Sequence, residues 1–496
     1  MRPLPWRASR TGSTSSGART LVVGAGAAGR TLARDLMRTH EYGLAVVGFL
    51  DDDAHKRRIG RLPVLGPLSS LAETVREQAI DVVVVAIPSL PPIELAAVVR
   101  EAVRCGVRVR YLPSFFAAVQ RDSRSGDLAV PPATLLGRAE VQVVRPATQS
   151  IVRGKRVLVT GAGGSIGSEL CRQIRSYHPA ALYMLDHDES NLHGLQLEIS
   201  GAALLDTDEL LVADIRDRDR VDQIFATFRP EVVFHAAAHK HLPLLERHPC
   251  EGVKSNVLGT QYLVDAAVDT GCERFILIST DKAAEPTSVL GATKRLAELI
   301  VASRAGQGTA LGSVRFGNVL GSRGSLLHVL AYQIAAGEPV TITDPDVDRF
   351  FMTVEEAVGL VLEAGAMAEA GETFVLDMGE PVRIVSLVEA YAAQCGASDV
   401  TITFTGLRPG EKLKESLFGT HEERTPTAHP RISAALATTP LDDLEPRLAP
   451  LYLATQQNVA DDVRGHLAEL VPDYRPPALA VPSAVGLFDA PYPDGF

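Results

Sequence analysis

The chain is poor in the features that hold small secreted, metal-bound or membrane proteins together. Its 496 residues include five cysteines with no Cys-x-x-Cys spacing, so we expect neither a disulfide framework nor a structural zinc site. No apolar run approaches the roughly 20 residues that cross a bilayer. The arginines near the N-terminus are not followed by the apolar stretch of a secretory signal. We therefore expect a cytoplasmic protein without an integral membrane segment.

Positive charge is also in deficit. There are 49 Lys and Arg against 60 Asp and Glu, giving a net charge of -11, which disfavours a nucleic-acid-binding surface. A bound nucleotide is still compatible with this charge, because a helix N-terminus and a few arginines hold phosphates locally. The length exceeds one ordinary core, so two or three domains are expected.

Short apolar runs alternate with helical patterns in two series, as in parallel-sheet domains. The first series covers residues 19–120, between a predicted disordered basic tail (1–18) and a connecting segment (121–152). Its loop Gly24-Ala25-Gly26-Ala27-Ala28-Gly29 resembles a dinucleotide turn, and Asp51 has the position of a ribose-binding acid. Because no catalytic constellation follows, cofactor binding, nucleotide sensing and a vestigial role all stay open.

The second series is expected to cover residues 153–435. Its predicted strands cover residues 157–159, 181–185, 210–213, 232–236, 275–279 and 312–315. After the first strand the loop reads Thr160-Gly161-Ala162-Gly163-Gly164-Ser165-Ile166-Gly167. Gly161 allows the tight turn, Gly164 lets backbone amides approach a pyrophosphate, and Gly167 permits close helix packing. With Ser165 and Ile166 at the helix N-terminus, they form the predicted dinucleotide site.

Residues at the ends of the following strands complete this prediction. Asp186 follows Gly167 by about 20 residues, where a carboxylate binds the adenosine ribose and repels a 2′-phosphate. This acid favours NAD over NADP as the cofactor. Asp214 and Ile215 are expected to flank the adenine. The small side chains suited to a backbone that passes under a dinucleotide are those of Ala236, Ala237 and Ala238.

A polar stretch follows the strand predicted over residues 275–279. Thr280, Asp281 and Lys282 put a hydroxyl, an acid and a base side by side at its carboxyl end, and Lys294 comes near the start of a helical pattern. Because ligands bind at the carboxyl ends of parallel strands, these residues would face a nicotinamide. The stretch indicates a redox step coupled to proton transfers. The alternative is an ion pair that only fixes a loop.

Other polar segments are less specific. The His-rich segment 235–241 would align its side chains only if extended, so we expect no metal site, and Lys240 within it is a candidate substrate contact. The segments 315–319 and 408–412 carry arginines, which pair with phosphates and favour a phosphorylated substrate. Past residue 316 the alternation weakens, which predicts a small substrate lobe. A C-terminal extension follows over residues 436–496, irregular from about residue 476.

Several ordered motifs together resemble one known family. They read TGAGGSIGSE from Thr160, STDKA from Ser279, RFGNVLGS from Arg315, RFFMT from Arg349, DMGEP from Asp377 and RPGEKL from Arg408. They resemble the nucleoside-diphosphate-sugar 4,6-dehydratases of bacterial polysaccharide biosynthesis, which are extended short-chain dehydrogenase/reductases. The resemblance spans about residues 20–435 and implies an α/β protein with two Rossmann-like, doubly wound parallel-sheet domains. It also implies a homo-oligomer, in a soluble form without the membrane-spanning region of long members.

The resemblance implies a lyase that uses NAD to convert a UDP-sugar, commonly UDP-N-acetylglucosamine, into a 4-keto-6-deoxy sugar nucleotide. Lys282 would take the C5 proton, Asp281 would protonate the departing 6-hydroxyl, and Lys294 would bind the nicotinamide ribose and favour loss of the 4-hydroxyl proton. These roles require a neutral lysine beside a protonated acid. Because the two groups interact, their protonation is described by the pKa values of the pair and not of either residue alone. The residues expected to hold the nucleotide-diphosphate part are Asn318, Arg349, Arg408 and Glu411.

One position departs from the wider family. Short-chain dehydrogenases place Tyr four residues before the lysine, whereas this chain has Leu290, which cannot ionise. The 4-hydroxyl proton must then pass to Thr280, a water or Asp281. Three alternatives follow: a dehydratase that inverts C5, a 5,6-dehydratase or epimerase on a sugar nucleotide, and a catalytically inactive protein that senses nucleotide or NAD.

Overall fold

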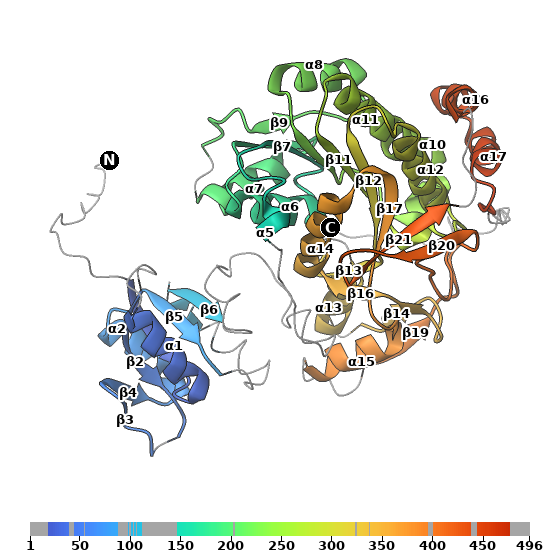
Figure 1. Ribbon diagram of the computed structural model, residues 1–496. Coiled ribbons are helices and arrows are strands. Elements are labelled where there is room, and N and C mark those ends of the chain that lie inside the picture. The colour runs from blue at the N-terminus through green and yellow to red at the C-terminus, as the bar shows by residue number, and fades with distance from the viewer. Residues whose placement is uncertain are drawn as a thin grey trace, which may run out of the picture. The chain divides into compact units, whose positions relative to one another are not determined.

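The computed structural model describes residues 18–38, 44–53, 55–87, 98, 101–102, 104–105, 107–111, 146–201, 204–322, 325–336, 338–394, 400–437 and 444–476. The chain divides into two compact units, residues 1–131 with 390–399 and residues 132–389 with 400–496. Each unit contains a predominantly parallel sheet covered by helices, so the predicted α/β class is confirmed (Figure 1). The predicted tail up to residue 17, most of the connecting segment and the region after residue 476 lie outside the described residues.

The first unit is a sheet in the order β3-β4-β2-β1-β5-β6, parallel except for the β3–β4 pair. Its strands are β1 (Ala18–Val23), β2 (Leu44–Leu50), β3 (Arg58–Ile59), β4 (Leu62–Gly66), β5 (Val82–Val85) and β6 (Arg108–Tyr111). Helix α1 (Ala27–Arg38) packs Leu32 and Leu36 on one face, and α2 (Leu71–Glu77), after the 3₁₀ turn η2 (Leu68–Ser70), packs Leu71 and Val75 on the other. All four valines of β5 are buried, as expected for a strand covered on both faces.

The glycine loop of this unit has the geometry of a dinucleotide turn. Gly24 has φ +103°, and a Cβ built on Gly29 would lie 1.9 Å from the Gly24 carbonyl oxygen. Asp51, at the end of β2, accepts a hydrogen bond from the Ala25 amide at 2.7 Å and pairs with Lys56 at 3.0 Å. The predicted ribose-binding acid thus holds the loop itself.

The second unit contains a larger sheet in the order β20-β21-β17-β12-β11-β10-β7-β8-β9. The strands from β17 to β9 pair in parallel, whereas β21 is antiparallel to both β17 and β20. Their bounds are β7 (Arg156–Thr160), β8 (Ala181–Asp186), β9 (Leu210–Val212), β10 (Val232–His235), β11 (Arg274–Ile278), β12 (Ala310–Arg315), β17 (Ala370–Leu376), β20 (Glu422–Pro426) and β21 (Ile432–Ala437). The carboxyl ends of the parallel strands meet at one edge, where ligands bind in such sheets.

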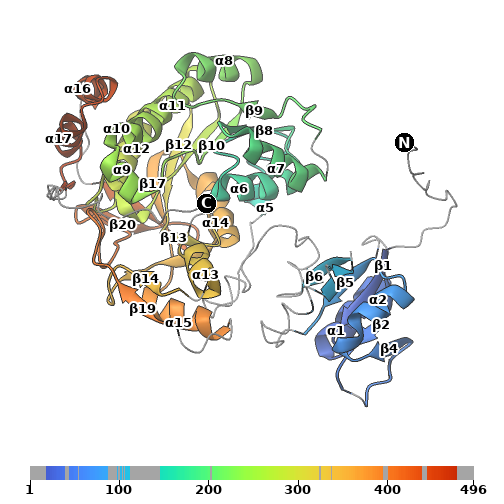
Figure 2. The same cartoon turned by 180° about the vertical axis from the view of Figure 1, so that it is seen from behind.

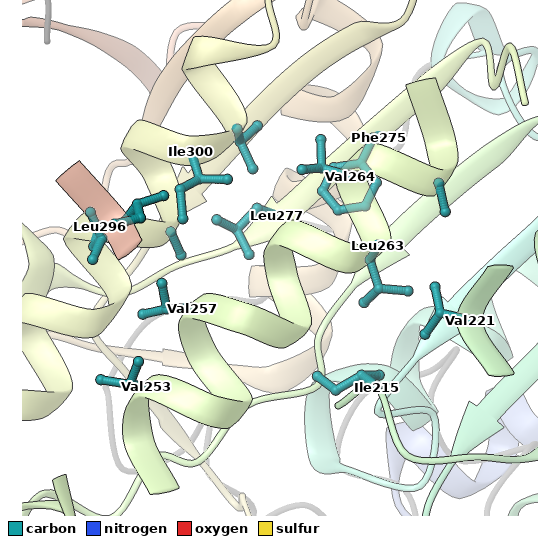
Figure 3. Packing of buried hydrophobic residues seen from close by; sticks show 14 of the residues in the cluster. Ile215, Val221, Val253, Val257, Leu263, Val264, Phe275, Leu277, Leu296 and Ile300 are labelled. Carbon is teal, nitrogen blue, oxygen red and sulfur yellow. The ribbon is translucent and has the colours of Figure 1, made fainter. Parts of the chain in front are cut away.

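Helices cover both faces of this sheet (Figures 1 and 2). One face carries α8 (Arg218–Phe228), α9 (Leu242–Arg247), α10 (Pro249–Gly252), the π-helical η4 (Val253–Leu258), α11 (Gly259–Asp269) and α12 (Val289–Ser303). The other carries α6 (Ser165–Ser176), α7 (Glu189–Ser200) and α14 (Val354–Met367), and α5 (Pro146–Gln149) lies beside α14. Figure 3 shows Phe275 and Leu277 of β11 against Leu263 of α11 and Ile300 of α12, all fully buried.

Beyond residue 316 the chain is more regular than predicted. Strands β17, β21 and β20 extend the main sheet, whereas the other strands of this region form separate two-stranded pairs. The shorter elements are β13 (Asn318–Leu320) paired with β16 (Phe351–Thr353), β14 (Val340–Ile342) with β19 (Ile402–Phe404), β15 (Asp348–Arg349) with β18 (Val382–Arg383), and helices α13 (Leu326–Ala336) and α15 (Ile384–Gln394).

The predicted extension contains a helical pair, α16 (Leu444–Gln456) and α17 (Ala460–Leu470). Leu448, Leu451 and Leu467 are fully buried and belong to the same apolar cluster as β11 and α12. These helices are therefore part of the second unit's core. Among the described residues, none of the helices combines the length and apolar character that crossing a bilayer requires.

Candidate active site

The second glycine loop forms a close-packed turn between β7 and α6. Gly161 has φ +64°, and a Cβ there would lie 2.7 Å from the Ala237 backbone, while one on Gly167 would lie 2.0 Å from the Gly161 carbonyl oxygen. Gly164 precedes α6 in an extended conformation, and no side chain caps the helix there. The N-terminus of a helix carries partial positive charge and presents backbone amides along its axis, so the start of α6 suits a phosphate.

Asp186 lies beside this loop at the end of β8. Its Oδ2 accepts from the Gly163 amide at 2.8 Å and its Oδ1 from the Asp188 amide at 3.0 Å. The side chain is buried, and a carboxylate has further lone pairs for a ribose diol. The residues present therefore fit an adenine dinucleotide: a close turn, an uncapped helix N-terminus and an acid at the next strand.

The two residues predicted to flank the adenine lie after β9. Asp214 Oδ2 accepts hydrogen bonds from Arg216 Nε at 2.9 Å and from Arg216 Nη2 at 2.6 Å. Arg216 also donates to Glu251. Partial burial raises the pKa of Asp214, but the hydrogen bonds from Arg216 outweigh it and lower this pKa overall. Ile215 is buried, and a Cβ built on Gly259 of α11 would lie 2.6 Å from the Ile215 side chain. Asp214 is thus already paired, while Ile215 fixes the approach of α11.

The end of β10 is fixed by a buried imidazole that sequence reasoning left without a role. His235 Nε2 lies 2.9 Å from Thr260 Oγ1, which itself donates to the Asn256 carbonyl oxygen, so Nε2 carries the proton. His235 Nδ1 then accepts from Thr160 Oγ1 at 2.7 Å. Burial, with the Lys294 charge nearby, lowers the pKa of His235 to about 3. The neutral ring ties β10 to β7 below the glycine loop.

Asn256 of the π-helical η4 positions the loop after β10. Its Oδ1 accepts from the His239 amide at 2.9 Å, and its Nδ2 donates to the His239 carbonyl and to Thr293 Oγ1, both at 3.1 Å. The loop brings Ala236 and Ala237 against Gly161, leaves Ala238 exposed and carries the exposed Lys240. Among the described residues there is no group of three or more His, Cys, Asp and Glu that could hold a metal ion.

The acid and base predicted side by side form a buried contact after β11. Lys282 Nζ lies 3.0 Å from Asp281 Oδ1, and Thr280 Oγ1 donates to the same oxygen at 2.9 Å. Asp281 Oδ2 is buried without a hydrogen-bond partner among the described residues, and it would lie 3.0 Å from a Cβ on Gly317. The turn η5 (Asp281–Ala283) approaches α12 so closely that a Cβ on Gly291 would lie 2.4 Å from the Lys282 carbonyl oxygen.

A further acid, which the sequence analysis missed, faces this pair. Glu415 Oε1 lies 3.6 Å from Lys282 Nζ, and Lys412 Nζ lies 3.7 Å from Glu415 Oε2. Burial lowers the pKa of Lys282, but the Asp281 and Glu415 carboxylates outweigh it and raise this pKa above its ordinary value. The signal in the sequence was Lys414-Glu415, which directly follows the RPGEKL motif that the prediction ended at Leu413.

Lys294 lies on α12, buried next to β11. Its Nζ donates to the Ile278 carbonyl oxygen at 2.6 Å, and burial lowers its pKa to about 8 against the opposing charge of Glu298. Leu290, in the position of the family tyrosine, is buried in the apolar cluster. The hydroxyl closest in sequence to the acid–base pair is that of Thr280, which already contacts Asp281.

Arg315 has a different environment from the one we predicted. Its side chain is fully buried, and it donates to Glu298 at 2.7 and 2.6 Å and to Glu422 at 2.6 and 2.8 Å. Arg295 also contacts both acids, at 3.1 and 2.9 Å, and Ser279 donates to Glu298 at 2.6 Å. The interpretation of Arg315 as a phosphate ligand is wrong, because its donors are used inside the fold.

Most predicted substrate residues surround the loop after β19. Arg349 is buried and donates to the carbonyl oxygens of Asp348, Lys412 and Leu413 and to Glu411 at 3.3 Å. Glu411 also accepts from the Arg408 amide, while the Arg408 side chain is exposed. Arg349 thus fixes this loop, and Arg408 has the exposure that a phosphate ligand needs. Asn318, half-buried at the start of β13, follows Gly317 at the acid–base pair.

Two family models match the chain. Residues 157–437 match the family described as polysaccharide biosynthesis protein, and residues 6–113 match a CoA-binding domain. The chain is 42% identical to the probable polysaccharide biosynthesis protein EpsC of Bacillus subtilis over 424 residues, which cover 84% of this chain and 70% of that protein.

More distant relatives carry the names of specific enzymes. The chain is 32% identical to the UDP-N-acetylglucosamine 4,6-dehydratase (inverting) of Campylobacter jejuni and 32% identical to the UDP-glucose 4-epimerase of Rickettsia canadensis, each match covering 54% of this chain and 79% of the relative. Among solved structures, Pen from Bacillus thuringiensis is 32% identical, with 58% of this chain and 90% of that chain covered and a TM-score of 0.53.

Proposed function

The chain belongs to the polysaccharide biosynthesis protein family, and on this premise we propose that it is an NAD-dependent 4,6-dehydratase of a UDP-sugar, with UDP-N-acetylglucosamine as the first substrate to test. The observation that carries the proposal is the buried contact of Thr280, Asp281 and Lys282 at the strand end beside a dinucleotide turn. The product would be a 4-keto-6-deoxy sugar nucleotide.

The dinucleotide would be held by the glycine loop, the first turn of α6, Asp186 and Lys294. When bound, NAD⁺ supplies the acceptor for the hydride of C4 and the donor of the same hydride to C6. Lys294, buried and already bonded to the Ile278 carbonyl oxygen, has further N–H groups for the ribose hydroxyls. The backbone of Ala236 and Ala237, which packs against Gly161, would pass under the dinucleotide.

Thr280 and Asp281 would provide the path for the 4-hydroxyl proton that Leu290 cannot accept. The Thr280 hydroxyl already donates to Asp281 Oδ1, so it can take the sugar proton as it passes its own to the carboxylate. This transfer leaves a protonated Asp281 next to the 6-hydroxyl of the 4-keto sugar.

Elimination then uses both members of the pair. Neutral Lys282 takes the C5 proton, which the ketone acidifies, and Asp281 gives its proton to the 6-hydroxyl, which leaves as water. After hydride addition at C6, Lys282 returns its proton to C5. The protein thus ends with the protons it began with, and the sugar has lost one water.

The test is conversion of UDP-N-acetylglucosamine and a panel of sugar nucleotides in the presence of NAD, followed by mass spectrometry for the loss of one water. Asp281→Asn and Lys282→Met should each lower kcat by about 10²–10⁴. Lys414→Met is the matched control, because that lysine is 77% exposed in the same loop as Glu415. Unimpaired turnover in both site variants, or no water loss with any sugar nucleotide, would refute the proposal.

A C5-inverting 4,6-dehydratase is the second candidate, since one relative carries that name. Product NMR after reaction in D₂O separates the two, because both incorporate one deuterium at C5 but with opposite configuration there. A 4-epimerase would give neither water loss nor C5 deuterium, and an inactive sensor would give no product. The acid–base pair argues against simple epimerisation, which needs no proton transfer at C5.

A further inference from the structure

Glu415 contacts the proposed base although it is remote from it in sequence. Its side chain is 3% exposed, and its Oε1 lies 3.6 Å from Lys282 Nζ. Asp281 Oδ1 lies 3.0 Å from the same nitrogen. The ammonium of Lys282 is therefore shared by two buried carboxylates, of which only Asp281 has a role in the proposed reaction.

The charges of this cluster are balanced but incompletely hydrogen-bonded. Lys412 Nζ lies 3.7 Å from Glu415 Oε2, which gives two acids and two amines. Asp281 Oδ2, Glu415 Oε2 and Lys412 Nζ are buried and have no hydrogen-bond partner among the described residues. Because native folds satisfy nearly all buried polar atoms, these three atoms need polar partners, which water or the hydroxyl groups of a substrate can supply.

The loop that carries Glu415 is firmly held. Arg349 donates to the Lys412 and Leu413 carbonyl oxygens at 2.8 and 3.0 Å. Thr287 Oγ1, just before α12, donates to the Gly410 carbonyl oxygen at 2.9 Å. Gly410 has φ +78°, and a Cβ there would lie 2.9 Å from Ser288 Cβ, so only glycine allows this close approach. The segment that leads into Glu415 is thus fixed by Arg349 and by the residues just before α12.

We propose that Glu415 is a positioning residue for the dehydration: its carboxylate holds the Lys282 amine in place, favours its protonated form and thereby sets the pH at which Lys282 becomes neutral and can accept the C5 proton. The proposal rests on the function proposed above. The charged groups that act on Lys282 are Asp281 and Glu415, which favour its protonated form, and Arg349, which opposes it. Lys412 acts through Glu415 by sharing its carboxylate.

The first test is the pH dependence of kcat. A lysine base works only when neutral, so the rate rises with pH through the lysine titration. Glu415→Gln removes one of the two acids that favour the ammonium, and this rise should move to lower pH by about one unit or more. Glu415→Asp keeps the charge and should return the profile toward that of the wild type. Glu423→Gln, the same change at an exposed residue of β20, should leave the profile in place.

Lys412→Met gives the opposite sign and serves if Glu415→Gln fails to fold. Without the Lys412 ammonium, Glu415 acts on Lys282 alone, so the rise should move to higher pH. A purely structural role would lower the rate or stability of both variants without moving their profiles in opposite directions. Unmoved profiles in folded variants would overturn the proposal.

The second test does not depend on turnover. Lys282 is 19% exposed, so its acetylation by acetic anhydride, measured by mass spectrometry across pH, reports its titration directly. Labelling should begin at lower pH in Glu415→Gln and at higher pH in Lys412→Met. If the wild type converts no sugar nucleotide, the proposed function fails and the positioning role falls with it. If the wild type is active but labelling is unshifted in both variants, only the role of Glu415 is overturned.

Discussion

Replacing Arg315 by Met would test the buried ion network that joins Arg315 to Glu298 and Glu422, next to the strand that precedes Asp281. The substitution leaves the carboxylates of Glu298 and Glu422, 1% and 4% exposed, without their central cation. Removing one partner of a buried ion pair costs about 3–5 kcal/mol, since the other charge stays desolvated. Arg295 still contacts both acids, at 3.1 and 2.9 Å, so we expect the lower end, about 3 kcal/mol.

The assay is urea unfolding followed by far-ultraviolet circular dichroism, with the KM for the sugar nucleotide measured in parallel. If Arg315 is structural, the free energy of unfolding falls by about 3 kcal/mol while KM changes little below the transition. A double variant with Glu422→Gln should lose less than the sum of the two single variants, because one unpaired acid is removed. A loss below about 1 kcal/mol together with a large rise in KM would refute this reasoning and restore Arg315 as a substrate ligand.

Two further predictions concern the site's backbone and its buried imidazole. Gly291→Ala should lower kcat about 10²-fold, because the added Cβ would lie 2.4 Å from the Lys282 carbonyl oxygen and displace the turn η5. Initial rates measure this effect. Gly194→Ala is the control, because an added Cβ there meets no atom within 4 Å. His235 has its pKa lowered to about 3, so below about pH 6.5 the unfolded chain binds the proton and the folded chain does not. The free energy of unfolding should therefore fall by about 1.4 kcal/mol between pH 7.5 and 5.5, and urea unfolding of His235→Gln should lack this part of the slope.

The six strands predicted for the second series, from residues 157–159 to 312–315, all form strands of the larger sheet with similar bounds. Buried parallel strands are short apolar runs bounded by turns, and the run at Phe275–Ile278 is a clear case. Strand β17 was missed because its apolar run, Phe374–Leu376, is short and lies where the alternation with helices had weakened. Strand β21 was missed because a run of small residues gains its strand character only by pairing with β17.

The contacts of the candidate site also fall into two groups, those between neighbours in the sequence and those made only by the folded chain. The glycine loop and the contact of Asp281 with Lys282 join residues close in sequence, so their proximity could be predicted before the fold was known. Glu415 reaches Lys282 only because a distant loop docks beside α12, and no local pattern encodes that approach. Arg315 shows the converse: donor-rich composition indicated a phosphate ligand, whereas tertiary packing supplies two acids that use its donors.

The helical pair α16 and α17 has a practical consequence for trimming the chain. Arg464 of α17 donates to the Glu246 carbonyl oxygen at 2.5 Å, and Glu246 Oε1 accepts from the Val289 amide at 2.7 Å, at the first residue of the helix that bears Lys294. Ending the protein at Ala437, where the match to the family model stops, would remove this hydrogen bond from Arg464. It would also expose the apolar residues that α16 and α17 cover. A shortened version with an intact core should therefore retain the chain through Tyr474, whose side chain is also buried.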